Sequence, residues 1–169
     1  MRQILFNKDI IKRRVQDLGR EISQDYSDSK IFMIVLLKGA FIFASDLIRE
    51  LSPKVHVEFM NISSYDGQNS TGKVKIEQDI TCDIKNQHVL IVEDIVDTGL
   101  TLNNLLKELY QRQPASIEIC SFLDKPSRRE VPVDVKYVGF EIENVFVVGY
   151  GMDYCQMYRQ CPDIQIISE

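Results

Sequence analysis

The sequence predicts an α/β fold in which a mainly parallel central sheet is flanked by helices. Two stretches carry this prediction, because each has an unbroken apolar run, a short polar turn and then a helical pattern. The first joins the run 31–37 to a helix over 40–51 through Lys38-Gly39. The second joins the run 89–92 to a helix marked by Leu102, Leu105, Leu106 and Leu109. Apolar runs without alternation are typical of strands that are buried on both faces.

Composition indicates an ordinary globular protein. The 169 residues suit one domain over 1–169, with 44% hydrophobic and 27% charged residues. The net charge of -5 and the pI near 5.1 argue against a general nucleic-acid or anionic-membrane surface. No run approaches the roughly 20 apolar residues of a membrane span, and no signal peptide is visible. The four cysteines and two histidines show no zinc-binding spacing, which favours reduced thiols and a cytoplasmic protein.

The remaining elements follow from spacing along the chain. Met1-Arg2-Gln3 is expected to lead directly into a surface helix that Asn7 caps, with Ile11, Val15, Leu18 and Ile22 on its buried face and a solvated basic cluster at 12–14. Alternation predicts half-buried strands at 55–60 and 73–76, separated by a polar stretch at 61–72 that is either an exposed hairpin loop or a mobile lid. Further strands are predicted at 116–123, 145–150 and 164–167, with 131–133 as an extended connector.

The stretch 93–101 carries the most chemistry. Its three carboxylates, Glu93, Asp94 and Asp97, stand beside Thr98, Gly99 and Thr101 at the expected start of a helix. A helix start binds anions through free N–H groups and a partial charge of roughly +0.5. Because three acids repel a phosphate, the site calls for a hard cation such as Mg²⁺ and a ligand with hydroxyl groups. The plainer alternative is that Asp97 and Thr98 cap the helix while Glu93 and Asp94 are solvated.

Glu93-Asp94-Ile95-Val96-Asp97-Thr98-Gly99-Leu100-Thr101 resembles the phosphoribosyl pyrophosphate motif of type I phosphoribosyltransferases, in the form found in the hypoxanthine-guanine members of that family. The resemblance implies the family's fold, with a small hood formed by the chain termini. It implies that Thr98, Gly99 and Thr101 bind the sugar phosphate, and that Glu93 and Asp94 hold the ribose hydroxyls and organise Mg²⁺. Asp97 is then the candidate general base. Leu100 is a departure, because relatives often carry lysine there.

Other motifs follow in the family's order. Leu37-Lys38-Gly39 is similar to the loop that binds pyrophosphate, often with a cis peptide before the lysine, and Ser63-Ser64-Tyr65 resembles the start of the flexible catalytic loop. Lys125, in Leu123-Asp124-Lys125-Pro126, corresponds to the lysine that reads the exocyclic oxygen of a 6-oxopurine. Taken alone, Lys38 reads as a solvated turn lysine, and Lys125 shows no function. The stretch 146–154 resembles the family's purine pocket, with Phe146, Val147 and Asp153 around the base and Asp153 also serving Mg²⁺. Arg159 matches the arginine that contacts pyrophosphate. Without the resemblance, Phe146 reads as a core residue.

The implied protein is a purine salvage enzyme. It would transfer the phosphoribosyl group of phosphoribosyl pyrophosphate to hypoxanthine or guanine, giving IMP or GMP and pyrophosphate. The resemblance further implies a Mg²⁺-dependent homodimer or homotetramer that acts on small molecules and needs neither nucleic acid nor membrane. One rival is a regulator of the same fold that binds RNA or DNA, although it would need a basic face. Another is a transferase for xanthine or adenine, of which Lys125 argues only against adenine.

Overall fold

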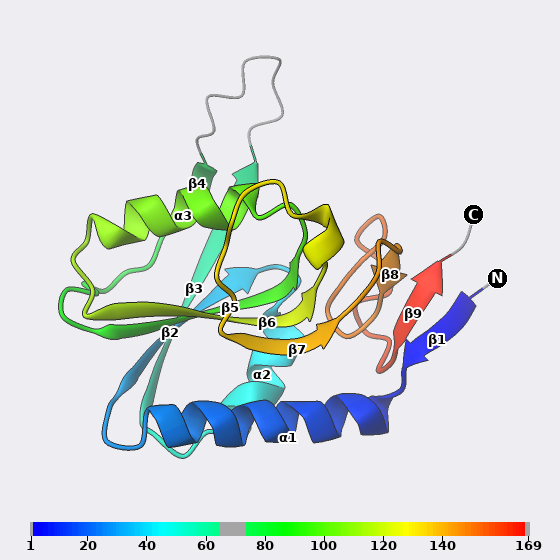
Figure 1. The fold of residues 1–169 in the computed structure, drawn as a ribbon, viewed down its shortest axis with the longest axis horizontal. Helices are drawn as coiled ribbons and strands as arrows, with labels where there is room; N and C mark the ends of the chain where they lie inside the picture. The colour runs from blue at the N-terminus through cyan, green and yellow to red at the C-terminus, as the bar shows by residue number, and fades with distance from the viewer. Residues whose placement is uncertain (1, 65–73, 168–169) are drawn as a thin grey trace.

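The computed structural model describes residues 2–64 and 74–167, and it contains a central six-stranded sheet (Figure 1). The strand order is β4-β3-β2-β5-β6-β7. The strands are β2 (Ile31–Leu37), β3 (Val55–Ser64), β4 (Val74–Gln78), β5 (His88–Val96), β6 (Ser116–Asp124) and β7 (Tyr137–Glu141). All neighbours pair in parallel except β3 and β4, which are antiparallel. The predicted parallel α/β sheet is therefore confirmed.

Helices cover both faces of this sheet. Figure 1 shows α1 (Lys8–Asp25) and α2 (Phe41–Arg49) on one face and α3 (Leu100–Tyr110) on the other. The prediction for α1 is confirmed, because the Asn7 side chain accepts hydrogen bonds from the backbone N–H groups of Asp9 and Ile10. The four residues expected on its apolar face are all buried, at Ile11, Val15, Leu18 and Ile22. Each face of the sheet thus carries its own apolar core.

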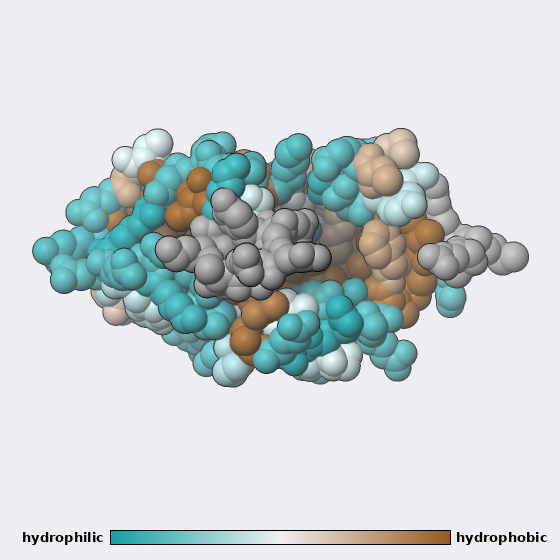
Figure 2. Space-filling view, turned by 90° about the horizontal axis from the view of Figure 1, so that it is seen from above, coloured by the Kyte–Doolittle hydropathy of each residue, from teal (hydrophilic) through white to brown (hydrophobic). Residues whose placement is uncertain are grey.

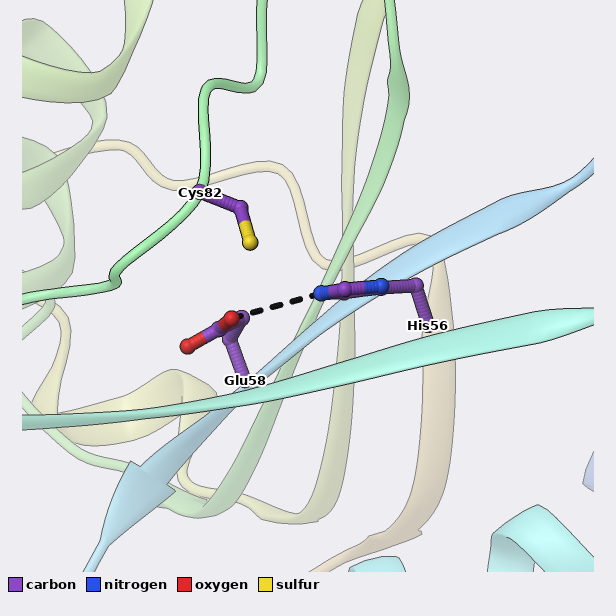
Figure 3. Close-up of side chains that lie close together, drawn as sticks. All are labelled: His56, Glu58 and Cys82. Carbon is purple, nitrogen blue, oxygen red and sulfur yellow. Dashed lines mark hydrogen bonds and ion pairs between the residues drawn. The ribbon is translucent and has the colours of Figure 1, made fainter.

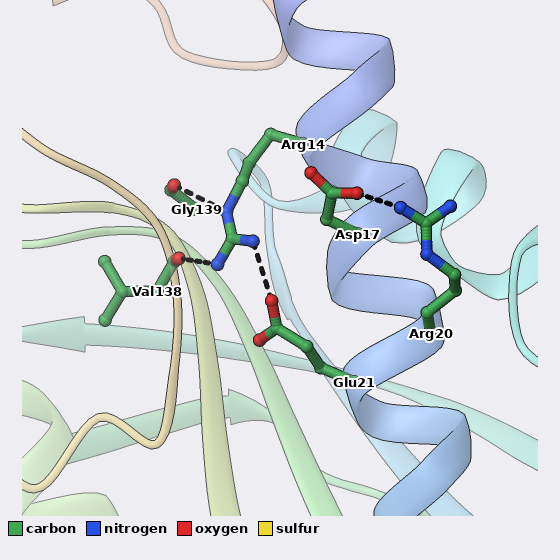
Figure 4. A network of polar contacts seen from close by, with 6 residues as sticks. All are labelled: Arg14, Asp17, Arg20, Glu21, Val138 and Gly139. Carbon is green, nitrogen blue, oxygen red and sulfur yellow. Dashed lines mark hydrogen bonds and ion pairs between the residues drawn. The ribbon is translucent and has the colours of Figure 1, made fainter.

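Arg14 corrects the expectation of a wholly solvated basic cluster on α1. Its Nε donates to the Gly139 carbonyl at 2.9 Å and its Nη2 to the Val138 carbonyl at 2.7 Å, while Nη1 pairs with Glu21 at 2.8 Å (Figure 4). β7 is the edge strand of the sheet, and an edge strand presents backbone groups that no further strand can pair. The same figure shows Arg20 turned away from β7 and paired with Asp17. One arginine of α1 therefore fixes the edge of the sheet.

The chain termini form a second, smaller sheet, hereafter called the hood. Its order is β1-β9-β8, from β1 (Arg2–Phe6), β9 (Ile164–Ile167) and β8 (Val147–Val148), and all its pairs are antiparallel. Most of the surface in Figure 2 is hydrophilic, whereas apolar residues gather over the hood on the right. Exposed apolar side chains in and beside the hood include Ile4 of β1, Phe146 just before β8, and Met157 in the segment between β8 and β9. The hood implied by the family resemblance is therefore present.

Two element predictions were wrong in the hood. The first residues form β1 and do not lead directly into the helix, because Arg2, Gln3, Ile4 and Phe6 pair with β9, a partner more than 150 residues away. The expected strand over 145–150 shrinks to Val147–Val148. Gly149 and Tyr150 have φ angles of 99° and 49°, which end an extended strand. A β-carbon on Gly149 would overlap the Asp163 carbonyl, so the chain passes too close for another residue.

Two further elements differ from expectation in the central sheet. β3 continues to Ser64, so the first part of the polar stretch 61–72 is strand and not loop; residues 65–73 lie outside the described part of the chain. β7 was not predicted, because it is short and contains Gly139, whose missing side chain leaves room for the backbone of Phe122. No helix in the described part of the chain is long and apolar enough to cross a membrane.

Candidate active site

The acidic motif lies where β5 leaves the sheet. The strand was expected to end at Val92, but it runs on to Val96, so Glu93 and Asp94 are strand residues and not turn residues. Their pairing explains the difference, because Glu93 and Ile95 still match Ser121 and Leu123 of β6. Successive strand residues point to opposite faces. The side chains of Glu93 and Asp94 therefore leave β5 on opposite faces of the sheet.

The start of α3 is open for a ligand. Its N-cap residue is Gly99, with a φ of 81° and no side-chain capping bond. The Thr98 hydroxyl accepts a long hydrogen bond, 3.4 Å, from the Leu100 N–H, whereas the Asp97 carboxylate accepts one of 3.1 Å from Arg128 Nε. The reading in which Asp97 caps the helix is therefore wrong. The first turn of a helix leaves N–H groups without partners inside the helix, and such groups can bind an anion.

The turn after β2 packs directly onto the end of β5. The Leu37-Lys38 peptide is cis, as the family resemblance implied. A β-carbon on Gly39 would overlap the Asp94 carboxylate, and one on Gly151 would overlap the Gly39 carbonyl. Since Gly151 belongs to the segment after β8, the turn is held between β5 and the hood. Three segments far apart in sequence therefore meet at Gly39.

Arg159 and Asp153 close the site from the hood side. Arg159 Nη2 pairs with Asp153 Oδ1 at 2.8 Å, and Nη1 donates to the Gly151 carbonyl at 2.7 Å. Asp153 Oδ2 also accepts a hydrogen bond of 2.7 Å from the Gln156 N–H. These bonds make a compact loop after β8. These two predicted site residues thus stand together, with the arginine partly neutralising the carboxylate.

Two cavities adjoin along the acidic motif. The first, about 340 Å³, is lined by the predicted site residues Lys38, Gly39, Glu93, Asp94, Asp97, Thr98, Gly99, Thr101, Asp153 and Arg159. The second, about 250 Å³, is lined by the predicted base-site residues Lys125, Phe146 and Val147, together with Met152. Both cavities share Asp94, Ile95, Asp97 and Asp153. A ligand with a phosphorylated end and a ring could therefore span them.

Lys125 and Phe146 give the second cavity its character. Lys125 is buried, and burial lowers the pKa of its ammonium group, while the charge of Asp97 opposes that shift. Within the described residues, its side chain has no hydrogen bond or ion pair. Phe146 is 52% exposed, so the reading of it as a core residue is wrong, and its ring meets Tyr154 edge to face. A donor and an open aromatic face are what a planar heterocycle with a carbonyl oxygen requires.

Carboxyl groups of Glu93, Asp94, Asp97 and Asp153 gather along the first cavity. Burial raises the pKa of the Glu93 carboxyl well above its usual range, and the neighbouring Asp94 carboxylate raises it further. Carboxylate oxygens beside a site for a phosphate suit a hard cation such as Mg²⁺, which offsets the repulsion between the two. Within the described residues, however, Glu93, Asp94 and Asp153 do not bring three ligand atoms within 4.8 Å of one another. Mg²⁺ fits here with one or two carboxylates and takes its other ligands from water or substrate phosphates.

Arg128 and Arg129 were missed in the sequence. Arg128 pairs with the Asp97 carboxylate, and Arg129 donates to the Asp97 carbonyl at 2.6 Å and pairs with Asp124. Their only signal is two adjacent basic residues two positions after Pro126. Two predicted residues of the catalytic loop are not brought into the site. Ser64 ends β3, with no side-chain geometry described, and Tyr65 lies outside the described residues.

The chain is similar to known proteins in both sequence and structure. A family model described as a phosphoribosyl transferase domain matches residues 2–155. The chain is 47% identical to a hypoxanthine phosphoribosyltransferase of Haemophilus influenzae over 92% of this chain and 89% of the relative. It is 44% identical to a hypoxanthine-guanine phosphoribosyltransferase of Dictyostelium discoideum over 99% and 96%. A solved hypoxanthine-guanine phosphoribosyltransferase of Bacillus anthracis superposes with a TM-score of 0.95 at 40% identity, covering 98% of each chain.

Proposed function

The chain belongs to the phosphoribosyl transferase family, and from this membership we propose a purine salvage enzyme that acts on hypoxanthine or guanine. It transfers the phosphoribosyl group of phosphoribosyl pyrophosphate to the base and releases pyrophosphate. The observation that carries the assignment is the pair of cavities joined at Asp94, Asp97 and Asp153. One cavity has the helix start that suits a phosphate, and the other has the lysine and ring that suit a 6-oxopurine.

The phosphate half of the substrate would occupy the first cavity. The start of α3, with Thr98, Gly99 and Thr101, is proposed to bind the sugar phosphate through N–H and hydroxyl donors. Lys38, Gly39 and Arg159 line the same cavity and would hold the pyrophosphate. Asp94 and Glu93 are proposed to bind the ribose hydroxyls. Positioning of this kind would put the anomeric carbon at the junction of the two cavities.

The base would occupy the second cavity. Phe146 offers its exposed face for stacking, and Val147 and Asp153 border the ring. The Lys125 ammonium would donate to the exocyclic oxygen of a 6-oxopurine. Adenine presents an amino group there, so two donors would face each other without an acceptor. Lys125 therefore favours hypoxanthine and guanine over adenine.

Asp97 is proposed as the general base, since it lines both cavities. A ring nitrogen of the purine forms the new bond to the anomeric carbon as the bond from that carbon to the pyrophosphate oxygen breaks. Asp97 accepts the proton that the five-membered ring of the purine loses. Bound Mg²⁺, with one or two of Glu93, Asp94 and Asp153 as its proposed ligands, would neutralise charge on the departing pyrophosphate. Ser64 and Tyr65 are proposed to belong to the loop that excludes water.

The broader setting completes the proposal. We infer one catalytic domain over residues 1–169, working in the cytoplasm on small molecules. We also propose that the enzyme is a homodimer or homotetramer. A similar solved structure, of Trypanosoma cruzi hypoxanthine phosphoribosyl transferase, addresses the role of that protein's C-terminal region in its oligomeric state.

The experiment that tests the activity measures pyrophosphate release with each base in turn. Hypoxanthine, guanine, xanthine and adenine are supplied separately with phosphoribosyl pyrophosphate and Mg²⁺. We expect release with hypoxanthine or guanine and almost none with adenine. Adenine as the best substrate, or release that does not depend on a base, would contradict the proposal. Omission of Mg²⁺ with a chelator present should abolish the signal.

A further inference from the structure

Three potential metal ligands meet on the face of the sheet that α3 covers. His56 and Glu58 are two residues apart on β3 and so point to the same face, and Cys82 comes from the segment between β4 and β5 (Figure 3). One ligand atom from each lies within 4.8 Å of the other two. His56 Nε2 is 3.3 Å from Glu58 Oε1. Within the described residues, this is the sole group of three such side chains.

This cluster, hereafter the His-Glu-Cys cluster, is separate from the active site. His56 and Glu58 pair with Phe32 and Ile34 of β2, in the first half of that strand. The active site begins beyond Leu37, at the other end of β2. None of the three residues lines either of the two active-site cavities. The cluster therefore takes no part in the chemistry proposed above.

Neighbouring groups hold the cluster in place. The His56 ring stacks on Phe32 at a centroid distance of 4.7 Å, which fixes the plane of the imidazole. Glu58 accepts hydrogen bonds from the Thr81 hydroxyl at 2.9 Å and the Thr81 N–H at 3.3 Å. The Thr81 bond lowers the pKa of Glu58 to about 2, with a smaller contribution from His56. Glu58 is thus a carboxylate at neutral pH, and its supporting bonds are of the kind that orient metal ligands.

We propose that His56, Glu58 and Cys82 form a binding site for a divalent transition metal of the Zn²⁺ class. A set of imidazole, carboxylate and thiolate suits Zn²⁺ and excludes Mg²⁺ and Ca²⁺, which prefer oxygen alone. Tetrahedral Zn²⁺ places such ligand atoms roughly 3.3–3.8 Å apart, given bonds of about 2.0–2.3 Å. The His56–Glu58 distance already matches, and Cys82 is exposed and can close the remaining gap.

Binding has a defined chemistry and consequence. The Cys82 thiol loses its proton to solvent as the sulfur–metal bond forms, and the neutral His56 binds through Nε2. Three protein ligands leave a fourth position for water. The metal would link β3 to the segment that leads into β5, and so stabilise the folded state by mass action. The alternative is a hydrogen-bonded network of the same residues that binds no metal.

The test is a Zn²⁺ titration against a chromophoric chelator, with millimolar Mg²⁺ present to occupy the carboxylates of the active site. We expect one Zn²⁺ per chain. Cys82→Ser and His56→Asn should each weaken binding at least about 100-fold, because even outer partners of a metal cost roughly 10–100-fold. The matched controls are Cys155→Ser, another exposed cysteine, and His88→Asn, the other histidine. Neither should change the affinity.

A second measurement needs no variant. The wild-type protein is alkylated with iodoacetamide with and without one equivalent of Zn²⁺, and the rate at each cysteine is read by mass spectrometry. Zn²⁺ should slow modification of Cys82 at least about 10-fold and leave exposed Cys155 unaffected. Absence of Zn²⁺ binding, equal loss in the control variants, or unchanged alkylation of Cys82 with Zn²⁺ bound would each overturn the proposal.

Discussion

The Asp94 carboxylate lies directly against Gly39, in the space that a β-carbon on residue 39 would occupy. This contact joins the end of β5 to the turn after β2, and both segments line the phosphate cavity. Asp94, which is proposed to bind the ribose, can keep this position only because residue 39 is a glycine and has no side chain. The two motifs, more than 50 residues apart in sequence, therefore form one structural unit.

Gly39→Ala should displace the Asp94 carboxylate. We expect the KM for phosphoribosyl pyrophosphate to rise at least about 10-fold, and the free energy of unfolding to fall by about 1–3 kcal/mol, as for overpacked sites. Steady-state kinetics with each substrate varied in turn and urea denaturation provide the measurements. The KM for the base should change less. A wild-type KM for phosphoribosyl pyrophosphate would show that the Gly39–Asp94 contact is not needed.

Asp97→Asn should remove the general base and leave its surroundings largely intact. Turnover is expected to fall by about 10²–10⁴, because general-base work contributes that much, while binding of the product nucleotide changes little. The readouts are kcat and the Kd for the nucleotide by calorimetry. Asp134→Asn, at an exposed position in the connector before β7, serves as the control. Unaltered turnover would remove Asp97 from the proposed role.

Lys125→Gln tests the selection of the base. The buried ammonium has no side-chain partner among the described residues. Its removal should therefore weaken the interaction with the base and not a contact within the protein. We expect kcat/KM for hypoxanthine to drop by about 10–100-fold, equivalent to about 1–3 kcal/mol for a lost charged hydrogen bond, and discrimination against adenine to narrow. Lys107→Gln, on the exposed side of α3, is the matched control. An equal fall in kcat/KM for hypoxanthine and in kcat/KM for phosphoribosyl pyrophosphate would argue for a general structural role of Lys125.

The Asp79–Arg112 pair predicts a pH dependence of stability. Arg112 Nη1 and Nη2 bind the Asp79 carboxylate at 2.9 and 2.7 Å, and this interaction lowers the pKa of Asp79. A lowered folded-state pKa gives stability that is present above the unfolded-state pKa and lost as pH falls through the folded-state value. Because both side chains are partly exposed, the effect should not exceed about 1 kcal/mol. Asp79→Asn should therefore destabilise the protein at pH 7 but not at the acid end.

Urea unfolding at several pH values between neutral and about pH 3 measures this difference. Asp134→Asn again provides a control at an exposed aspartate. A destabilisation by Asp79→Asn that stays constant across the range would show that the pair does not titrate with unfolding.

The sequence predicted the elements that local patterns determine. Unbroken apolar runs identified β2 and β5, and the spacing of Ile11, Val15, Leu18 and Ile22 identified α1, because burial imposes these periods directly. β1 and β7 were missed because their stability comes from distant partners, β9 and β6. Nearly all predicted site residues were brought together, since the family's motifs carry them. The contacts of Arg129 and the His-Glu-Cys cluster were missed because they join separate elements, which no spacing reveals.

Arg129 and Arg128 both approach Asp97, but they should differ sharply in importance. Arg129 and Asp124 form a pair whose side chains are 16% and 9% exposed, whereas Arg128 and Asp97 are 45% and 41% exposed. Removing one partner of a buried pair costs about 3–5 kcal/mol, and an exposed pair contributes about 0–1 kcal/mol. Arg129→Gln should therefore destabilise the protein strongly, and Arg128→Gln only weakly. Chemical denaturation measures both.

The two variants also separate positioning from stability. Arg129 donates to the Asp97 carbonyl, so its loss should let the loop 97–99 shift. We therefore expect kcat to fall even at temperatures at which the variant is still folded. Arg129→Lys keeps a charge near Asp124 but lacks the second donor for the Asp97 carbonyl. If Arg129 positions Asp97, the lysine variant should regain stability more fully than kcat. Parallel recovery of both would mean that the residue acts on folding alone.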